Sequence, residues 1–322
     1  MRDVTLLVLA GLLALITAGC GANRGAEQLD GVRMMVPNSP GGGYDLTART
    51  AVKLMEDDGI TGRIRVFNVV GDAGTVAMAR LMNEAGNDQL MMTTGLGLVG
   101  AGYTNGTAIR MSDATPLAKL VEEPEAVLVP GDSPLRTIDD LVQAWRADPG
   151  SVTVGGGSLP GGPDHLFPME TARAVGVDPK QVEFVSYDGG GDLLTALFGH
   201  TVTVGTSGLG EYVEQIEAGA VRVLAVSGPE RVPGIDAPTL TEAGIDLTFT
   251  NWRGVLAPPG ISDETKDAMV EALSELHRSE AWREARAKNG WTDAFVTGTD
   301  FEQFLHEQDQ RVVSTLSELG LA

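Results

Sequence analysis

From Val36 to Asp45 the chain reads VPNSPGGGYD, in which an apolar segment runs into a glycine-rich loop and then into a helical pattern. The same order recurs after Val154, with GGGSLPGGPD, and after Val185, with SYDGGGD. A fourth, shorter loop, GDAG, spans residues 71–74. Strands that end in such loops and continue as helices form parallel sheets with helices on both faces. The recurrence therefore predicts an α/β fold.

The apolar pattern also predicts two lobes, because two segments, 122–129 and 249–255, are expected to cross between them. About 120 residues lie between the crossings, which is enough for a domain. We expect lobe I to comprise residues 31–124 and 251–322 and lobe II residues 125–250, each with a mainly parallel sheet flanked by helices. Two lobes joined by two strands would form a hinged cleft.

The glycine loops are suited to bind an anion. Ligands of open parallel sheets lie beyond the carboxyl ends of the strands, where helix N-termini present free N–H groups and a partial positive charge. The glycines could serve tight turns alone, but their recurrence in both lobes favours a binding site. No Arg or Lys lies within 40–45, 71–74, 155–164 or 186–192. We therefore expect backbone amides and water, rather than an arginine, to hold the anion, and we interpret Asp45, Asp164 and Asp192 mainly as helix N-caps.

Composition excludes several classes of protein. The 322 residues include 23 Lys plus Arg and 44 Asp plus Glu, which gives a net charge of −21. Nucleic acids and anionic membranes would repel so acidic a chain. Aromatic residues make up only 5%, which counts against an aromatic-lined sugar or nucleobase groove. The four histidines, at 165, 200, 277 and 306, lack metal-ligand spacing, so neither a metal nor a cofactor is expected.

The N-terminal segment indicates export. Residues 4–18 form an apolar run that is shorter than the ~20 residues needed to span a bilayer and has the length of a signal-peptide core. It ends in ITAGC, residues 16–20, which resembles the lipobox of bacterial lipoproteins. We expect 1–19 to be a lipoprotein signal peptide, 20–30 a tether, and lipid on Cys20 to anchor the exported protein to the outer face of the cell membrane. The alternative is a buried cysteine on a short core helix.

One motif points to a different class of protein, a dinucleotide-binding enzyme. Residues 95–100, GLGLVG, fit the G-x-G-x-x-G fingerprint. The motif follows the third strand rather than the first, and Asp113 lies in a polar loop rather than at a strand end. The export signal also disfavours nicotinamide chemistry. We therefore expect that the protein is not an enzyme.

At its glycine loops the sequence resembles the substrate-binding proteins of tripartite tricarboxylate transporters, also called the Bug family. The resemblance extends from Val32 to about Phe304, and the first loop is similar to that of the citrate-type members. It implies the two-lobed fold of type II periplasmic binding proteins, which closes around its ligand. The matching stretches are PGGGYDLTAR at 40–49, NVVGDAG at 68–74, GGPDH at 161–165, SYDGG at 186–190, VLAVS at 223–227, APTLTEAG at 237–244 and GVLAPPG at 254–260.

The resemblance also implies where a ligand carboxylate is held by backbone amides and bridging waters. Asp72 departs from the family pattern, and its carboxylate would repel an anion or face solvent. The candidate ligand-binding residues are Gly42, Gly43, Tyr44 and Asp45 in lobe I and Ser158, Gly161, Gly162, Asp188 and Gly189 in lobe II, together with Gly71, Thr94 and His165.

The sequence thus predicts a receptor that captures a small tricarboxylate or dicarboxylate and delivers it to the membrane permease subunits of a transporter. We expect it to be a monomer. Two alternatives stay open, a carboxylate sensor that acts on a signalling partner and an enzyme that uses the glycine loops. Transporter genes beside this one would favour the receptor over the sensor, and turnover of a bound nucleotide would favour the enzyme.

Overall fold

The computed structural model describes residues 29–187 and 189–322. The predicted signal peptide, the predicted lipidation site Cys20, and the candidate binding residue Asp188 lie outside these ranges. The strands are β1 (Arg33–Val36), β2 (Arg65–Asn68), β3 (Leu90–Gly95), β4 (Thr115–Pro130), β5 (Val154–Gly156), β6 (Phe184–Ser186), β7 (Val204–Gly208), β8 (Val221–Val226), β9 (Thr250–Ala257) and β10 (Thr292–Thr297). The α-helices are α3 (Gly43–Asp57), α4 (Thr75–Asn83), α5 (Leu96–Thr104), α6 (Ile138–Ala147), α7 (Pro163–Ala174), α8 (Gly190–Phe198), α9 (Val213–Glu217), α10 (Asp263–Arg278), α11 (Glu280–Lys288) and α12 (Gly298–Leu319).

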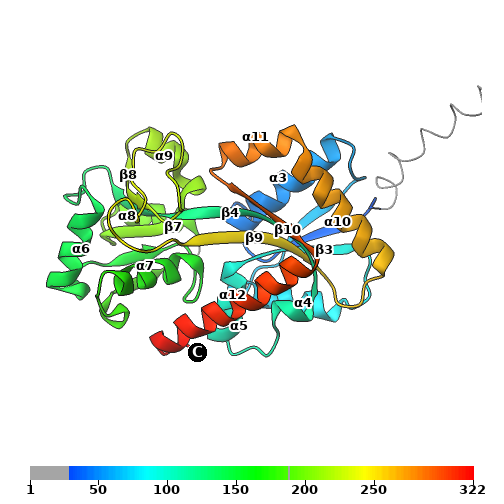
Figure 1. The fold of residues 1–322 in the computed structure, drawn as a ribbon, viewed down its shortest axis with the longest axis horizontal. Helices are drawn as coiled ribbons and strands as arrows, with labels where there is room; N and C mark the ends of the chain where they lie inside the picture. Colours follow the sequence, from blue (N-terminus) through cyan, green and yellow to red (C-terminus); the bar gives the residue numbers. More distant parts are fainter. Residues whose placement is uncertain (1–28, 188) are drawn as a thin grey trace, which may run out of the picture.

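These elements form two α/β lobes that lie side by side (Figure 1). A path of paired strands, β2-β1-β3-β9-β4-β7-β5-β6, links the lobes, and β8 and β10 also pair with β4. Strands β2, β1 and β3 are parallel in lobe I, and β7, β5 and β6 are parallel in lobe II. Strands β4 and β9 run antiparallel to each other because one leaves lobe I and the other returns to it. The predicted α/β fold of two lobes is confirmed.

The two predicted crossings lie in β4 and β9. Residues Thr115–Pro124 of β4 pair with β9, whereas residues from Glu125 onward pair with β7 and β8. One bent strand therefore belongs to both sheets. The lobe boundaries 31–124 with 251–322 and 125–250 stay a prediction.

Helix α12 makes a third connection between the lobes. It packs on α5 and β4, and its C-terminal part reaches α7 of lobe II (Figure 1). There Arg311 Nη2 lies 3.3 Å from Glu170 Oε2, and Arg173 Nη1 lies 2.6 Å from Glu318 Oε2. The last helix therefore joins lobe I to lobe II through two ion pairs.

The start of helix α6 follows from its local sequence. Helix α6 begins with a capping box, in which Thr137 Oγ1 accepts the Asp140 N–H and Asp140 Oδ2 accepts the Thr137 N–H.

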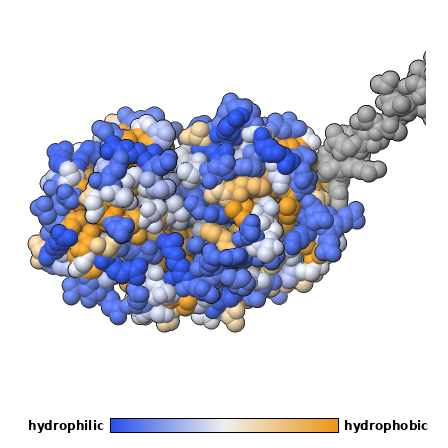
Figure 2. Space-filling model, viewed as in Figure 1, coloured by the Kyte–Doolittle hydropathy of each residue, from blue (hydrophilic) through white to orange (hydrophobic). Residues whose placement is uncertain are grey.

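Apolar side chains on both faces of the sheets are buried, among them Trp145, Trp252 and Trp282. Hydrophilic residues cover most of the face shown in Figure 2, and the apolar residues there form separate patches. Within the two described ranges, no helix has both the length and the apolar character of a membrane span.

Candidate functional site

A cavity of about 690 Å³ lies between the lobes, within the range typical of small-molecule sites. It is lined by the loops that follow β1 and β2 in lobe I, by those that follow β5 and β6 in lobe II, and by β9. The strand ends of both lobes thus converge on one space, as the glycine loops predict. Seven of the candidate residues line it: Gly42, Gly43, Tyr44, Gly71, Ser158, Gly162 and Gly189.

The loop after β1 is shaped by its own side chains. Gly41 has φ +87°, a left-handed conformation that favours glycine, and its N–H donates to Asp45 Oδ2 at 2.9 Å. Asp45 also accepts from Arg49 Nε at 2.9 Å and from Asn68 Nδ2 at 2.8 Å. Burial alone would raise the pKa of Asp45, but these three hydrogen bonds lower it below its usual value. Asp45 therefore holds the loop and does not line the cavity.

The predicted N-caps need correction. Gly42, Gly162 and Gly189 occupy the N-cap positions of α3, α7 and α8, which were predicted for Asp45, Asp164 and Asp192, and none of these glycines supplies a side-chain cap. The first N–H groups of α3, on Gly43 and Tyr44, have no hydrogen-bond acceptor in the part of the chain that the structure describes. The start of α3 thus points unpaired donors at the cavity, which is the arrangement that binds anions.

Tyr44 connects this loop with α5. The N–H groups of Gly97 and Leu98, at the start of α5, lie near its hydroxyl oxygen and favour a lower pKa. Burial nevertheless raises the pKa of Tyr44 to about 12, so the phenol stays protonated. The glycine motif 95–100 fits the dinucleotide fingerprint, but the start of helix α5, which begins within it, is occupied by the Tyr44 side chain.

The loop after β5 is closed in a different way. Pro163 at the start of α7 has no N–H, and the Asp164 N–H donates to Ser158 Oγ at 3.2 Å. The Gly161 N–H donates to His165 Nδ1 at 3.2 Å, and the Gly162 N–H donates to the Leu159 carbonyl at 2.8 Å. Burial lowers the pKa of His165 to about 4, which keeps the ring neutral and able to accept. The Gly161 and Gly162 amides, which the sequence suggested for ligand binding, are therefore already paired within the protein.

Three further candidates lie away from the cavity lining. Gly161 and His165 are buried in the α7 turn. Thr94 is buried on β3, where its hydroxyl donates to Met111 Sδ at 3.1 Å.

A cluster of buried charges beneath the cavity is the feature that sequence reasoning missed. Arg253 on β9 lines the cavity, is 5% exposed, and forms an ion pair with Glu123 of β4. Glu125 lies two residues further along β4, fully buried. Burial raises the pKa of Glu125 well above its usual value, and the charges of Asp164 and Glu123 raise it further.

Two more carboxyl groups beside this cluster line the cavity from lobe II, the buried Asp164 and the half-buried Glu211. Burial raises the pKa of Asp164 to about 7, against the opposing effects of Ser207 and the Gly157 N–H. Burial also raises the pKa of Glu211 to about 8, and the neighbouring Asp164 adds to this. Among the described residues, Arg253 is the one cationic side chain of the lining. The cavity is thus more acidic than its glycine loops suggest.

A signal for this cluster exists in the sequence. Glu123 and Glu125 lie two residues apart in the first predicted crossing, and Asn251 and Arg253 lie two apart in the second. Alternate residues of a strand point to the same face, so each pair shares a face. Charged residues at alternate positions of otherwise apolar crossing strands indicate a polar floor for the cleft.

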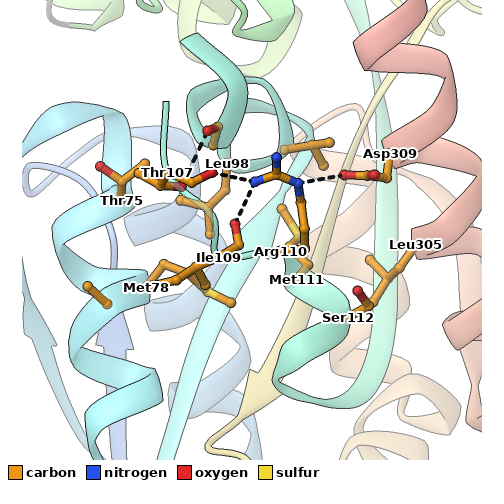
Figure 3. A pocket seen from close by; sticks show the side chains of 13 residues that line it. Thr75, Met78, Leu98, Thr107, Ile109, Arg110, Met111, Ser112, Leu305 and Asp309 are labelled. Atoms are coloured by element: carbon orange, nitrogen blue, oxygen red, sulfur yellow. Dashed lines mark hydrogen bonds and ion pairs between the residues drawn. The ribbon is translucent and has the colours of Figure 1, made fainter. Parts of the chain in front are cut away.

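Two other features of the described chain do not form a comparable site. A crevice of about 50 Å³ lies between α4, α5 and α12, where Arg110 is held by the Thr107 and Ile109 carbonyls and lies 3.9 Å from Asp309 (Figure 3). It has room for a few waters only. Within the described ranges, no three His, Cys, Asp or Glu side chains are arranged to hold a metal ion. The cavity between the lobes is the candidate site.

Two α/β lobes around a cavity of this size have the architecture of a solute-binding receptor. Residues 60–321 match the family described as tripartite tricarboxylate transporter family receptor, and the chain belongs to this family. It is 25% identical over 332 residues to protein BugT of Bordetella pertussis, with 99% of each chain covered.

Two solved structures share the fold. MatC from Rhodopseudomonas palustris with bound malate superposes with a TM-score of 0.77 at 23% identity, covering 89% of this chain and 99% of that one. R. palustris Rpa4515 with adipate gives 0.78 at 22% identity, covering 90% and 97%. The expected type II periplasmic-binding-protein fold and the expected family are both confirmed.

Proposed function

We propose that this protein is the exported receptor of a tripartite tricarboxylate transporter, which captures a small organic carboxylate between lobe I (31–124 and 251–322) and lobe II (125–250). The observation that carries this proposal is the cavity of about 690 Å³, into which α3 directs the unpaired N–H groups of Gly43 and Tyr44. A carboxylate at this position would complete the hydrogen bonding of the helix start and interact with its partial positive charge. Family membership and the carboxylates bound by MatC and Rpa4515 support it.

Delivery follows from the same proposal. The loaded receptor, a monomer held at the outer face of the cell membrane by lipid on Cys20, would present its closed form to the permease subunits. Binding and release of the carboxylate require no chemistry on the ligand, so no catalytic residue is proposed.

A thermal-shift screen of small organic carboxylates tests this function. A ligand at 100 times its dissociation constant adds about 2.7 kcal/mol to stability, which raises the unfolding temperature measurably. Small-angle scattering with the best compound should show a smaller radius of gyration than the free protein. A screen in which no carboxylate shifts the unfolding temperature would refute the proposal.

A further inference from the structure

The charges that line the cavity are not balanced. Arg253 is paired with Glu123, and burial favours the neutral form of Glu125. Asp164 and Glu211 therefore face the cavity with no cation of their own among the described lining residues, and the exposed Asp72 and Asp192 add further negative charge to the lining. A carboxylate shielded from water without a cationic partner is costly, so it either takes up a proton or meets a cation.

The starts of α3 in lobe I and of α7 in lobe II offer opposite chemistry to a ligand. Lobe I presents the unpaired N–H groups of Gly43 and Tyr44. Beside them lies Arg253, whose guanidinium a Cβ on Gly43 would overlap and whose Nε has no partner within the described chain. A nine-tenths buried guanidinium with an unused donor, next to an open helix start, suits an anion.

At and beside the start of α7, lobe II presents the carboxyl groups of Asp164 and Glu211 to the cavity. Pro163 removes the first N–H of α7, and the Gly157 and Gly190 amides face Asp164 and Glu211. A second ligand carboxylate here would meet like charge and few free donors. An ammonium group has three N–H donors. It would donate to the carboxylate lone pairs that accept no hydrogen bond from the protein.

We propose that the ligand is an aminocarboxylate, with its carboxylate at the start of α3 beside Arg253 and its ammonium group against Asp164 and Glu211. This inference rests on the proposed receptor function and narrows its substrate class. It predicts that the site discriminates against dicarboxylates of equal length. A positively charged nitrogen would also favour the ionised forms of Asp164 and Glu211, so its binding at neutral pH should release protons.

Isothermal titration calorimetry of the full chain with matched compounds tests the inference. The pairs are 4-aminobutanoate with succinate and 5-aminopentanoate with glutarate, and glutamate is compared with glutarate. We expect the best amino compound to bind at least tenfold more tightly than its dicarboxylate. Titrations at pH 7 in buffers of different ionisation enthalpy should show proton release for the amino compounds.

Glu211→Gln should weaken binding of the amino compound at least tenfold and leave glutarate binding equal or stronger. Glu214→Gln removes the same charge from an exposed position three residues further on and should change both affinities less than twofold. If Glu211→Gln does not fold, Asp164→Asn replaces it in the same comparison.

The outcomes separate the two proposals. Tighter binding of glutarate than of 5-aminopentanoate, with proton uptake, would overturn the aminocarboxylate inference and leave the receptor function standing. Equal effects of Glu211→Gln on both ligand classes would also overturn it. If no compound of either class binds, the receptor function itself fails, and the inference fails with it.

Discussion

The loops after β1 and after β5 have nearly the same backbone and opposite surface chemistry. Gly41 and Gly161 have φ of +87° and +90°, and the glycines that follow them are the N-caps of α3 and α7. In each loop a side chain four residues on accepts the N–H of the first glycine, Asp45 in one and His165 in the other.

The difference lies in the two residues that follow each N-cap glycine. Lobe I has Gly43 and Tyr44, which leave two donors open, whereas lobe II has Pro163 and Asp164, which supply no free donor and add a carboxylate. The comparison shows that a glycine-rich turn at a helix start is a scaffold for either sign of charge. The first two helical residues decide which sign the cavity presents.

The largest expected effect is the pH dependence of stability, because the two loops should contribute with opposite sign. The pKa of Asp164 is raised from 3.8 to about 7 in the folded protein, so between these values folding takes up a proton. Stability then falls as pH rises through that window, by at most about 1.4 kcal/mol per pH unit. The pKa of Asp45 is lowered from 3.8, so its contribution is lost as pH falls below that value.

Urea unfolding of the wild type, Asp164→Asn and Asp45→Asn from pH 3 to pH 8 would measure both contributions. Asp164→Asn should flatten the fall between pH 4 and pH 7, and Asp45→Asn should flatten only the acid limb. Identical profiles for the wild type and Asp164→Asn would show that the two loops do not differ in this way.

Local sequence patterns predicted much of this structure. They did not predict contacts between residues that lie far apart in the sequence. The capping box of Thr137 and Asp140 and the loop from Val36 to Asp45 depend on residues within one or two turns of each other. The pairing of Glu123 with Arg253 joins positions 130 residues apart. It depends on β4 and β9 lying side by side, which no local pattern specifies.

One feature of the α7 loop, its missing N–H donor, can be inferred from the sequence alone. Proline at the first helical position removes a donor wherever it occurs. The presence of Pro163 is therefore evidence in the sequence against an amide site at the start of α7. The orientation of the Asp164 side chain was not predictable in this way. It depends on burial against Gly157 and Ser207, which come from other segments.

The second prediction gives the lobe I loop the donor pattern of the lobe II loop. Gly43→Pro removes one N–H at a position where proline suits a helix, and Gly43→Ala keeps the N–H while making the same Cβ contact with Arg253. A hydrogen bond to a charged group contributes about 1.5–3 kcal/mol. Relative to Gly43→Ala, Gly43→Pro should therefore weaken carboxylate binding roughly tenfold to a hundredfold. Calorimetric titration of both variants measures this, and equal losses would mean that contact with Arg253, not the donor, is responsible.

The smallest expected effect is that of Arg49, a cation close to the open loop but outside the cavity lining. Its side chain is 50% exposed, and its guanidinium bonds Asp45 Oδ2 at 2.9 Å and Asn68 Oδ1 at 3.0 Å. Exposed ion pairs contribute about 0.2–1 kcal/mol, so Arg49→Ala should lower stability by no more than this. Because the Gly41 and Asn68 hydrogen bonds to Asp45 remain, the loop should keep its shape and carboxylate affinity should change less than twofold.

Urea unfolding and calorimetric titration of Arg49→Ala, beside Gly43→Pro, provide the measurement. If Arg49→Ala abolishes binding in a folded protein while Gly43→Pro binds normally, the ligand anion is held by a side-chain clamp. The contrast between open and closed helix starts would then not be what distinguishes the two lobes.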